Sequence, residues 1–139
     1  MQTFLPYPDF SESAKVLDRQ RLGKQRVETI QILKALTLPS YGWSRHPATL
    51  MWRGHVPALV QYGLAICAEW KRRGYVDNCA PQIAAFQPDG EISPPPPKWF
   101  GNPSFHPSPR SNLLRKDPQH YSQFAWTDPH ALPYIWPTA

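Results

Sequence analysis

The chain has 139 residues, of which 41% are hydrophobic, and its 15 lysines and arginines against 10 aspartates and glutamates give a net charge of +5. This length suits one domain with its own core and is too short for two. No apolar run approaches the roughly 20 residues that span a membrane, and nothing near the start resembles a signal peptide. We therefore expect residues 1–139 to form a single domain, cytoplasmic, soluble and monomeric.

The opening residues 1–10, MQTFLPYPDF, are apolar and aromatic, and their two prolines bar a regular helix. We expect an extended arm that lies on the core. Ser11 or Ser13 can cap a first helix, which runs to about Leu38 and stops ahead of a proline. Gly23 inside this helix costs about 1 kcal/mol relative to alanine. Its presence indicates that a packing partner or a ligand approaches the backbone there.

Three charged residues of this first helix occupy the stripe where apolar residues would run. At about 100° per residue, Arg21, Lys24 and Glu28 fall within roughly 60° of one another, on the same bearing as Leu17 and Ala35. This bearing predicts that they face packed protein or a cleft. A lysine and a glutamate four residues apart beside an arginine are typical of functional sites. The alternative is a solvated surface with ordinary ion pairs along the helix.

Basic residues are concentrated in this part of the chain. Six of them lie between Lys15 and Lys34, against only Asp18 and Glu28. A one-sided basic helix is the electrostatic footprint of a nucleic-acid-binding protein. A generic basic surface is the alternative.

The rest of the first part of the chain also favours helices. Residues 48–55 predict a short helical turn, residues 57–73 a second helix with Gly74 as its C-terminal cap, and residues 77–86 a short third helix. No segment alternates apolar and polar residues as a strand would. The fold class expected is therefore mainly α, with a compact bundle of about three helices over residues 11–86.

Residues 87–139 contain most of the 18 prolines together with many aromatic residues. They are too apolar for a disordered tail, so we expect an irregular, ordered wrap around the helices, with a short basic helix that Ser111 caps. Rings that alternate with cations suit unpaired bases and phosphates. Trp99 and His106 are the candidates for stacking, whereas most other rings, and Trp52, are expected in the core.

The chain contains two cysteines, Cys67 and Cys79. Without a second pair at metal-ligand spacing, they predict neither a disulfide framework nor a zinc site. We interpret both as reduced structural thiols and expect no metal or cofactor.

Three segments resemble a known family in their order along the chain. They are RLGKQRVE (residues 21–28), RGHV (residues 53–56) and EWKRRGY (residues 69–75). They are similar to segments of the pyrimidine-dimer DNA glycosylases of the phage endonuclease V type. The resemblance covers roughly residues 1–75 and is distant.

This resemblance implies a glycosylase with an associated lyase activity at abasic sites. In the family, the α-amino group exposed by removal of the initiator methionine attacks C1′ of the damaged nucleotide, and an imine to the opened sugar permits β-elimination. The glutamate of the family matches Glu28, which would position the amine and stabilise the cationic sugar. The partner implied is double-stranded DNA with a damaged or modified base.

The chain departs from the family pattern at the nucleophile. The family has a threonine directly after Met1, whereas this chain has Gln2, a bulky residue that usually leaves the methionine in place. The amine would then belong to Met1. Lys24 is the other amine within reach of Glu28, and burial beside Arg21 would favour its neutral form.

The sequence is compatible with several alternatives. The protein could hydrolyse the glycosidic bond with water activated by Glu28, or bind DNA without cutting it. A third possibility is an interaction protein that docks through its four prolines at 94–97. The candidate catalytic residues are Glu28, Lys24 and Met1, and the candidate nucleic-acid-binding residues are Arg21, Arg26, Arg45, His46, Arg53, His55, Trp99, His106, Arg110, Arg115 and Lys116.

Overall fold

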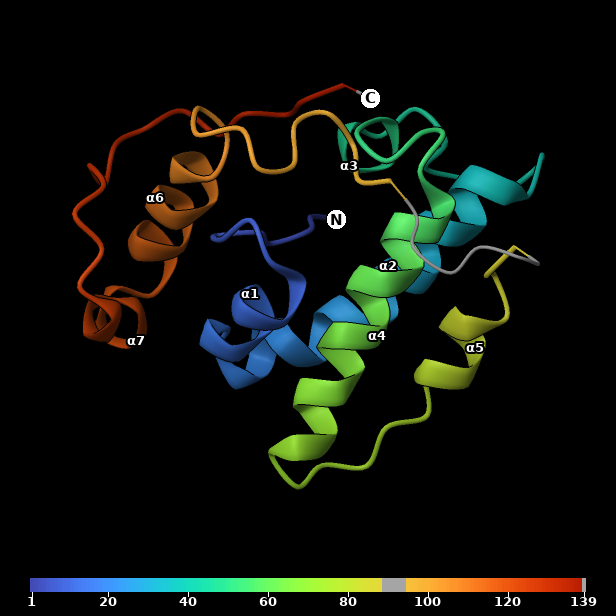
Figure 1. Ribbon diagram of the computed structural model, residues 1–139, viewed down its shortest axis with the longest axis horizontal. Helices are drawn as coiled ribbons and strands as arrows, with labels where there is room; N and C mark the ends of the chain where they lie inside the picture. Colours follow the sequence, from blue (N-terminus) through green and yellow to red (C-terminus); the bar gives the residue numbers. More distant parts are fainter. Residues whose placement is uncertain (89–94, 139) are drawn as a thin grey trace.

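The computed structural model describes residues 1–88 and 95–138, and within these ranges it contains helices and no strands (Figure 1). The mainly α class is confirmed, but the expected count of about three helices is too low. None of the described helices combines the length and the apolar character that a membrane crossing requires. The elements are α1 (Phe10–Val16), α2 (Arg19–Thr37), α3 (Pro47–Leu50), α4 (Val56–Arg72), α5 (Ala80–Ala84), α6 (Pro107–Lys116), α7 (Pro118–Tyr121) and a 3-10 turn, η1 (Ser122–Phe124).

The single first helix expected from the sequence is in fact two helices, α1 and α2. Asp18 has extended backbone between them, and its carboxylate accepts a hydrogen bond from the amide three residues later, which caps α2. At the start of α1 the cap is Asp9, in place of the expected Ser11 or Ser13. The expectation was wrong because a capping carboxylate inside a helical pattern can start a new helix.

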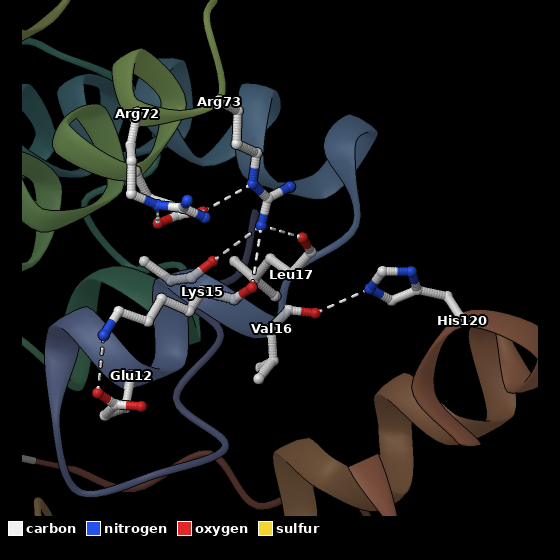
Figure 2. A network of polar contacts seen from close by, with 9 residues as sticks. Glu12, Lys15, Val16, Leu17, Arg72, Arg73 and His120 are labelled. Carbon is white, nitrogen blue, oxygen red and sulfur yellow. Dashed lines mark hydrogen bonds and ion pairs between the residues drawn. The ribbon is translucent and has the colours of Figure 1, made fainter. Parts of the chain in front are cut away.

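The break between α1 and α2 is held by residues distant in the sequence (Figure 2). Arg73, the C-cap of α4, donates to three main-chain carbonyls at the end of α1, of which that of Leu17 is the nearest at 2.8 Å. His120 of α7 donates from Nε2 to the carbonyl of Val16 at 2.9 Å. These bonds satisfy carbonyls that a helix end leaves without intrahelical partners.

The core forms where α2 packs against α4. Gly63 of α4 allows this close approach, because a methyl group in its place would lie 2.7 Å from the Thr29 side chain of α2. Gly23 of α2 likewise faces the Trp70 ring, 3.1 Å from where a methyl group would lie, so a packing partner accounts for this glycine. Trp52 is fully buried, as expected.

The N-terminal arm lies between α4 and α6 (Figure 1). On the α4 side, the amide of Phe4 donates to the Tyr62 hydroxyl at 3.0 Å. On the α6 side, the carbonyls of the two residues that follow Phe4 accept hydrogen bonds, the first from His106 and the second from Arg110, each at 2.7 Å. The helix expected from Ser111 begins earlier, at a proline in the N1 position of α6, because that residue suits a first turn. The tetraproline segment expected at 94–97 falls partly outside the described residues.

Candidate active site

A pocket of about 360 Å³ lies between the N-terminal arm, the first half of α2 and the end of α6. It brings together segments from both ends of the chain. The residues that line it are Met1, Gln2, Phe4, Gln20, Arg21, Lys24, Gln25, Glu28 and Lys116.

Helix α2 contributes the charged face expected from the sequence. Arg21, Lys24 and Glu28 all line the pocket, which confirms that the three share one face. Arg21 is partly buried and pairs with Asp18 at 3.1 Å. Lys24 is exposed, so the burial expected for it is wrong. The difference follows from the pocket, which opens this face of α2 to solvent.

The chain start is held in the pocket from two sides. The carbonyl of Gln2 accepts a hydrogen bond from Nε2 of Gln25 at 2.8 Å. The side chain of Gln2 accepts a hydrogen bond from Nζ of Lys116 at 3.1 Å. The half-buried Met1, which carries the α-amino group, therefore extends from a residue whose main chain and side chain are both fixed.

The carboxylate of Glu28 shares a donor with the chain start. Its Oε2 atom accepts a hydrogen bond from Nε2 of Gln25 at 2.8 Å, and that nitrogen also bonds the Gln2 carbonyl. Within residues 1–88 and 95–138, Oε1 of Glu28 has no hydrogen-bond partner and is available to a ligand.

The pocket is strongly positive, because Glu28 is the only carboxylate among its lining residues. Partial burial and repulsion from Arg21 lower the pKa of Lys116, and attraction to Glu28 opposes this shift. Burial and the positive amino terminus likewise lower the pKa of His46, again against the influence of Glu28. A site with this balance of charge attracts anions, and its lining includes amines and one carboxylate.

A comparison with models of known protein families matches residues 1–82 to the family described as pyrimidine dimer DNA glycosylase. The match covers more than half of the chain and includes every pocket residue except Lys116. This chain belongs to the pyrimidine dimer DNA glycosylase family. Searches among curated proteins and solved structures gave no match. The family supports a glycosylase-like function and DNA as the substrate.

Three arginines that were expected to contact DNA instead form ion pairs or hydrogen bonds within the protein. Arg26 pairs with Asp77 at 2.8 Å, and its guanidinium lies 4.4 Å from the centre of the Trp70 ring. Arg110 pairs with Asp128 at 2.7 Å. The third, Arg115, donates to the Ser111 hydroxyl and to two carbonyls near the chain end.

Trp99 and His106, the rings expected to stack on bases, are both in the core. Their exposed fractions are 5% and 3%. The indole of Trp99 donates to the carbonyl of Met51 at 2.8 Å, and His106 bonds the arm. Neither ring faces the pocket, so neither enters the site described here.

Two other candidate arginines lie beside a second hollow, of about 530 Å³. Arg45 and Arg53 are exposed and form no ion pair with the carboxylates of the described chain, although Arg53 donates to the Ser44 carbonyl at 3.2 Å. Nδ1 of His46 accepts a hydrogen bond from the amide of the second residue of α3. His55 occupies the N-cap position of α4 without a capping hydrogen bond.

Phe4, Gln20 and Gln25 line the pocket but were not predicted from the sequence, and of these Gln25 is the one that contacts Glu28. Its side chain is uncharged, so a search for titratable groups passes over it. The signal available was its position three residues before Glu28, the spacing at which side chains on a helix meet.

The two cysteines of this family member are free and buried, as expected. Burial raises the pKa of the Cys67 thiol to about 12, so the thiol stays protonated and unreactive at neutral pH. No group of histidines, cysteines and carboxylates in the described ranges could hold a metal ion.

Proposed function

We propose that this protein is a DNA glycosylase that removes a damaged or modified base by means of an amine nucleophile. The observation that carries the proposal is the pocket, in which Met1 and Lys24 lie with Glu28 in a space of about 360 Å³. An amine, a carboxylate and surrounding cations are what such a reaction uses.

The reaction breaks the bond between C1′ and the base while a bond forms between C1′ and the amine nitrogen. The base leaves with the electron pair and takes up a proton. Opening of the sugar ring then gives an imine at C1′, which accepts electrons. Loss of a proton from C2′ breaks the bond from C3′ to its phosphate oxygen, which is the associated lyase step.

Glu28 would orient the amine and stabilise the positive charge that develops on the sugar. Its Oε2 atom is occupied by Gln25, while Oε1 has no partner in the described part of the chain. A carboxylate fixed in this way needs little reorganisation when the sugar becomes cationic.

We favour the α-amino group of Met1 over Lys24 as the nucleophile. The residue next to that amine is fixed by Gln25 and Lys116, whereas Lys24 is exposed and makes no ion pair with a described carboxylate. An amine attached to a fixed residue loses less conformational freedom when it attacks.

The cations without carboxylate partners are the proposed phosphate contacts. Lys116 lines the pocket, and Arg45 and Arg53 line the second hollow. The same cations would serve a non-catalytic DNA-binding module, which is the second candidate function. That candidate leaves the placement of Glu28 unexplained.

Glu28→Gln separates the two candidates. We expect this change to lower the rate of glycosidic-bond cleavage in ultraviolet-irradiated duplex DNA, measured as strand breaks after alkali, by about 100-fold or more, the scale of a positioned acid or base. The DNA Kd should stay within about threefold of the original. Glu12→Gln is the matched control, because Glu12 forms an exposed pair with Lys15 away from the pocket.

The result that would contradict the glycosylase proposal is a wild-type protein that binds this DNA in a salt-dependent manner and breaks no glycosidic bond in it. Equal rates for the two variants would remove Glu28 from the mechanism.

A further inference from the structure

We infer that Gln25 is a positioning residue of the reaction, which fixes the Glu28 carboxylate and the chain start relative to each other. The inference rests on the proposed function, because it concerns the same pocket. Gln25 lies on α2 one turn before Glu28, and its exposed fraction is 0%.

The orientation of the Gln25 amide follows from its partners. Nε2 donates to the carbonyl of Gln2 and to Oε2 of Glu28, each at 2.8 Å. A carbonyl and a carboxylate only accept hydrogen bonds, so the amide nitrogen must face both of them. Both N–H groups of Gln25 are thereby used.

The oxygen of Gln25 is fixed from the opposite side. Oε1 accepts a hydrogen bond from the Tyr62 hydroxyl on α4, and that hydroxyl accepts from the amide of Phe4 at 3.0 Å. Burial raises the pKa of Tyr62, so the hydroxyl keeps the proton that it donates. The amide therefore joins α2, α4 and the arm in one network.

Packing alone does not explain why an amide occupies this position. An apolar side chain of similar size would fill the same buried position without the cost of desolvating an amide. The amide has no exposed atom with which to contact substrate, so it acts through its partners. One partner is the proposed catalytic carboxylate of Glu28. The other is Gln2, which follows directly after Met1, the residue that carries the proposed nucleophile.

The predicted consequence is a loss of rate with little loss of binding. Attack on C1′ requires the amine and the carboxylate to be placed within a fraction of an ångström, and a displacement of about 1 Å can cost 100-fold. Without Gln25, the arm and Glu28 lose their common anchor, while the cations that hold phosphates remain.

The experiment compares Gln25→Leu and Gln25→Glu with Gln31→Leu, a change of the same residue type on the same helix outside the pocket. Single-turnover glycosidic-bond cleavage in ultraviolet-irradiated duplex DNA is measured between pH 5 and 9 as strand breaks after alkali, with the DNA Kd and the unfolding temperature. For Gln25→Leu we expect a rate at least about tenfold below that of the wild type, with a DNA Kd within about threefold of the wild-type value.

Gln25→Glu keeps the size of the side chain and places a second carboxyl group beside Glu28. Two adjacent carboxyl groups hold a proton between them, so the acid limb of the pH–rate profile should move to higher pH. A merely structural role would lower the unfolding temperature and leave the shape of this profile unchanged.

A readout without DNA separates this inference from the proposed function. The 15N order parameters of the Gln2 and Thr3 amides should be about 0.85 in the wild-type protein and fall below about 0.6 in Gln25→Leu. If the wild-type protein breaks no glycosidic bond, the proposed function fails, but this loss of order still supports positioning by Gln25. Wild-type order, rate and pH profile in both Gln25 variants would overturn the inference.

Discussion

Individual cations in this protein differ in whether a carboxylate neutralises them. Arg26 and Arg110 form ion pairs at 2.8 and 2.7 Å with partly buried or buried carboxylates. Among the described residues, Arg45, Arg53 and Lys116 have no such partner. A positive net charge therefore overstates how many residues are available to phosphates, and the structure reduces the candidates to those without partners.

Lys116→Met tests this distinction. We expect weaker DNA binding and a slope of log K against log salt that falls by about one, because one phosphate contact is lost. Lys71→Met is the control, since Lys71 is an exposed lysine at the end of α4 that does not line the pocket. The affinity and its salt dependence come from fluorescence anisotropy at several salt concentrations. Equal effects of the two changes would contradict the assignment.

The sequence predicted part of the site at this scale. Helical spacing alone brought Arg21, Lys24 and Glu28 onto one face, because it depends only on local geometry. It could not place Lys116 beside them, since that contact depends on how α6 packs against the arm. Composition likewise could not distinguish a buried Trp99 from an exposed one, as an aromatic ring suits both a core and a base.

The helices themselves were predicted with different success. The expected helix over residues 57–73 corresponds to α4, and Gly74 follows it with a φ of +95°, as a C-terminal glycine cap requires. The break at Asp18 was missed because the apolar pattern continues across it. The position of the break depends on contacts with Arg73 at the end of α4 and with His120 and Tyr121 of α7, which are distant in the sequence.

The contact between α2 and α4 gives a prediction about stability. Gly63→Ala should lower the free energy of unfolding by about 2 kcal/mol, because the added methyl group would meet Thr29 and Ile83 atoms at 2.7 to 3.1 Å in a packed core. Gly42→Ala meets no atom within 4 Å and should change it by less than about 0.5 kcal/mol. Urea unfolding of both variants measures the difference, and equal stabilities would show that the helices can separate to admit the methyl group.

At the scale of the whole molecule, the last third of the chain completes a site that begins at the first residue. The family match ends at residue 82, yet Lys116 lines the pocket and five described residues beyond the match bond the arm. The single domain expected from the length stays a prediction. We expect the chain start to be disordered in a protein shortened before α6.

Three carboxyl groups make the stability depend on pH. Burial opposes ionisation of Asp18, but hydrogen bonds from Tyr121 and Arg21 outweigh it and lower its pKa. Hydrogen bonds from Arg72 lower the pKa of Glu69. Burial opposes ionisation of Asp77 as well, but hydrogen bonds, that from Arg26 first among them, lower its pKa.

A lowered pKa in the folded state means that the unfolded state binds more protons at acid pH. The stabilisation is therefore complete above the ordinary carboxyl pKa of about 4 and is lost as the pH falls through the lower folded values. Asp18→Asn keeps a capping side chain but removes one of these groups. Its free energy of unfolding should fall less between pH 6 and pH 3 than that of the wild type, as measured by urea unfolding. Identical losses would show that Asp18 does not contribute.

The most direct test of the account is borohydride reduction of the protein on ultraviolet-irradiated duplex DNA, followed by mass mapping of the adduct. An imine between enzyme and sugar becomes a stable secondary amine on reduction, so the method records the nucleophile itself. We predict an adduct at the α-amino group of Met1. An adduct at Lys24 alone would contradict the choice of nucleophile, and the absence of any adduct on DNA that the protein binds tightly would contradict the imine mechanism.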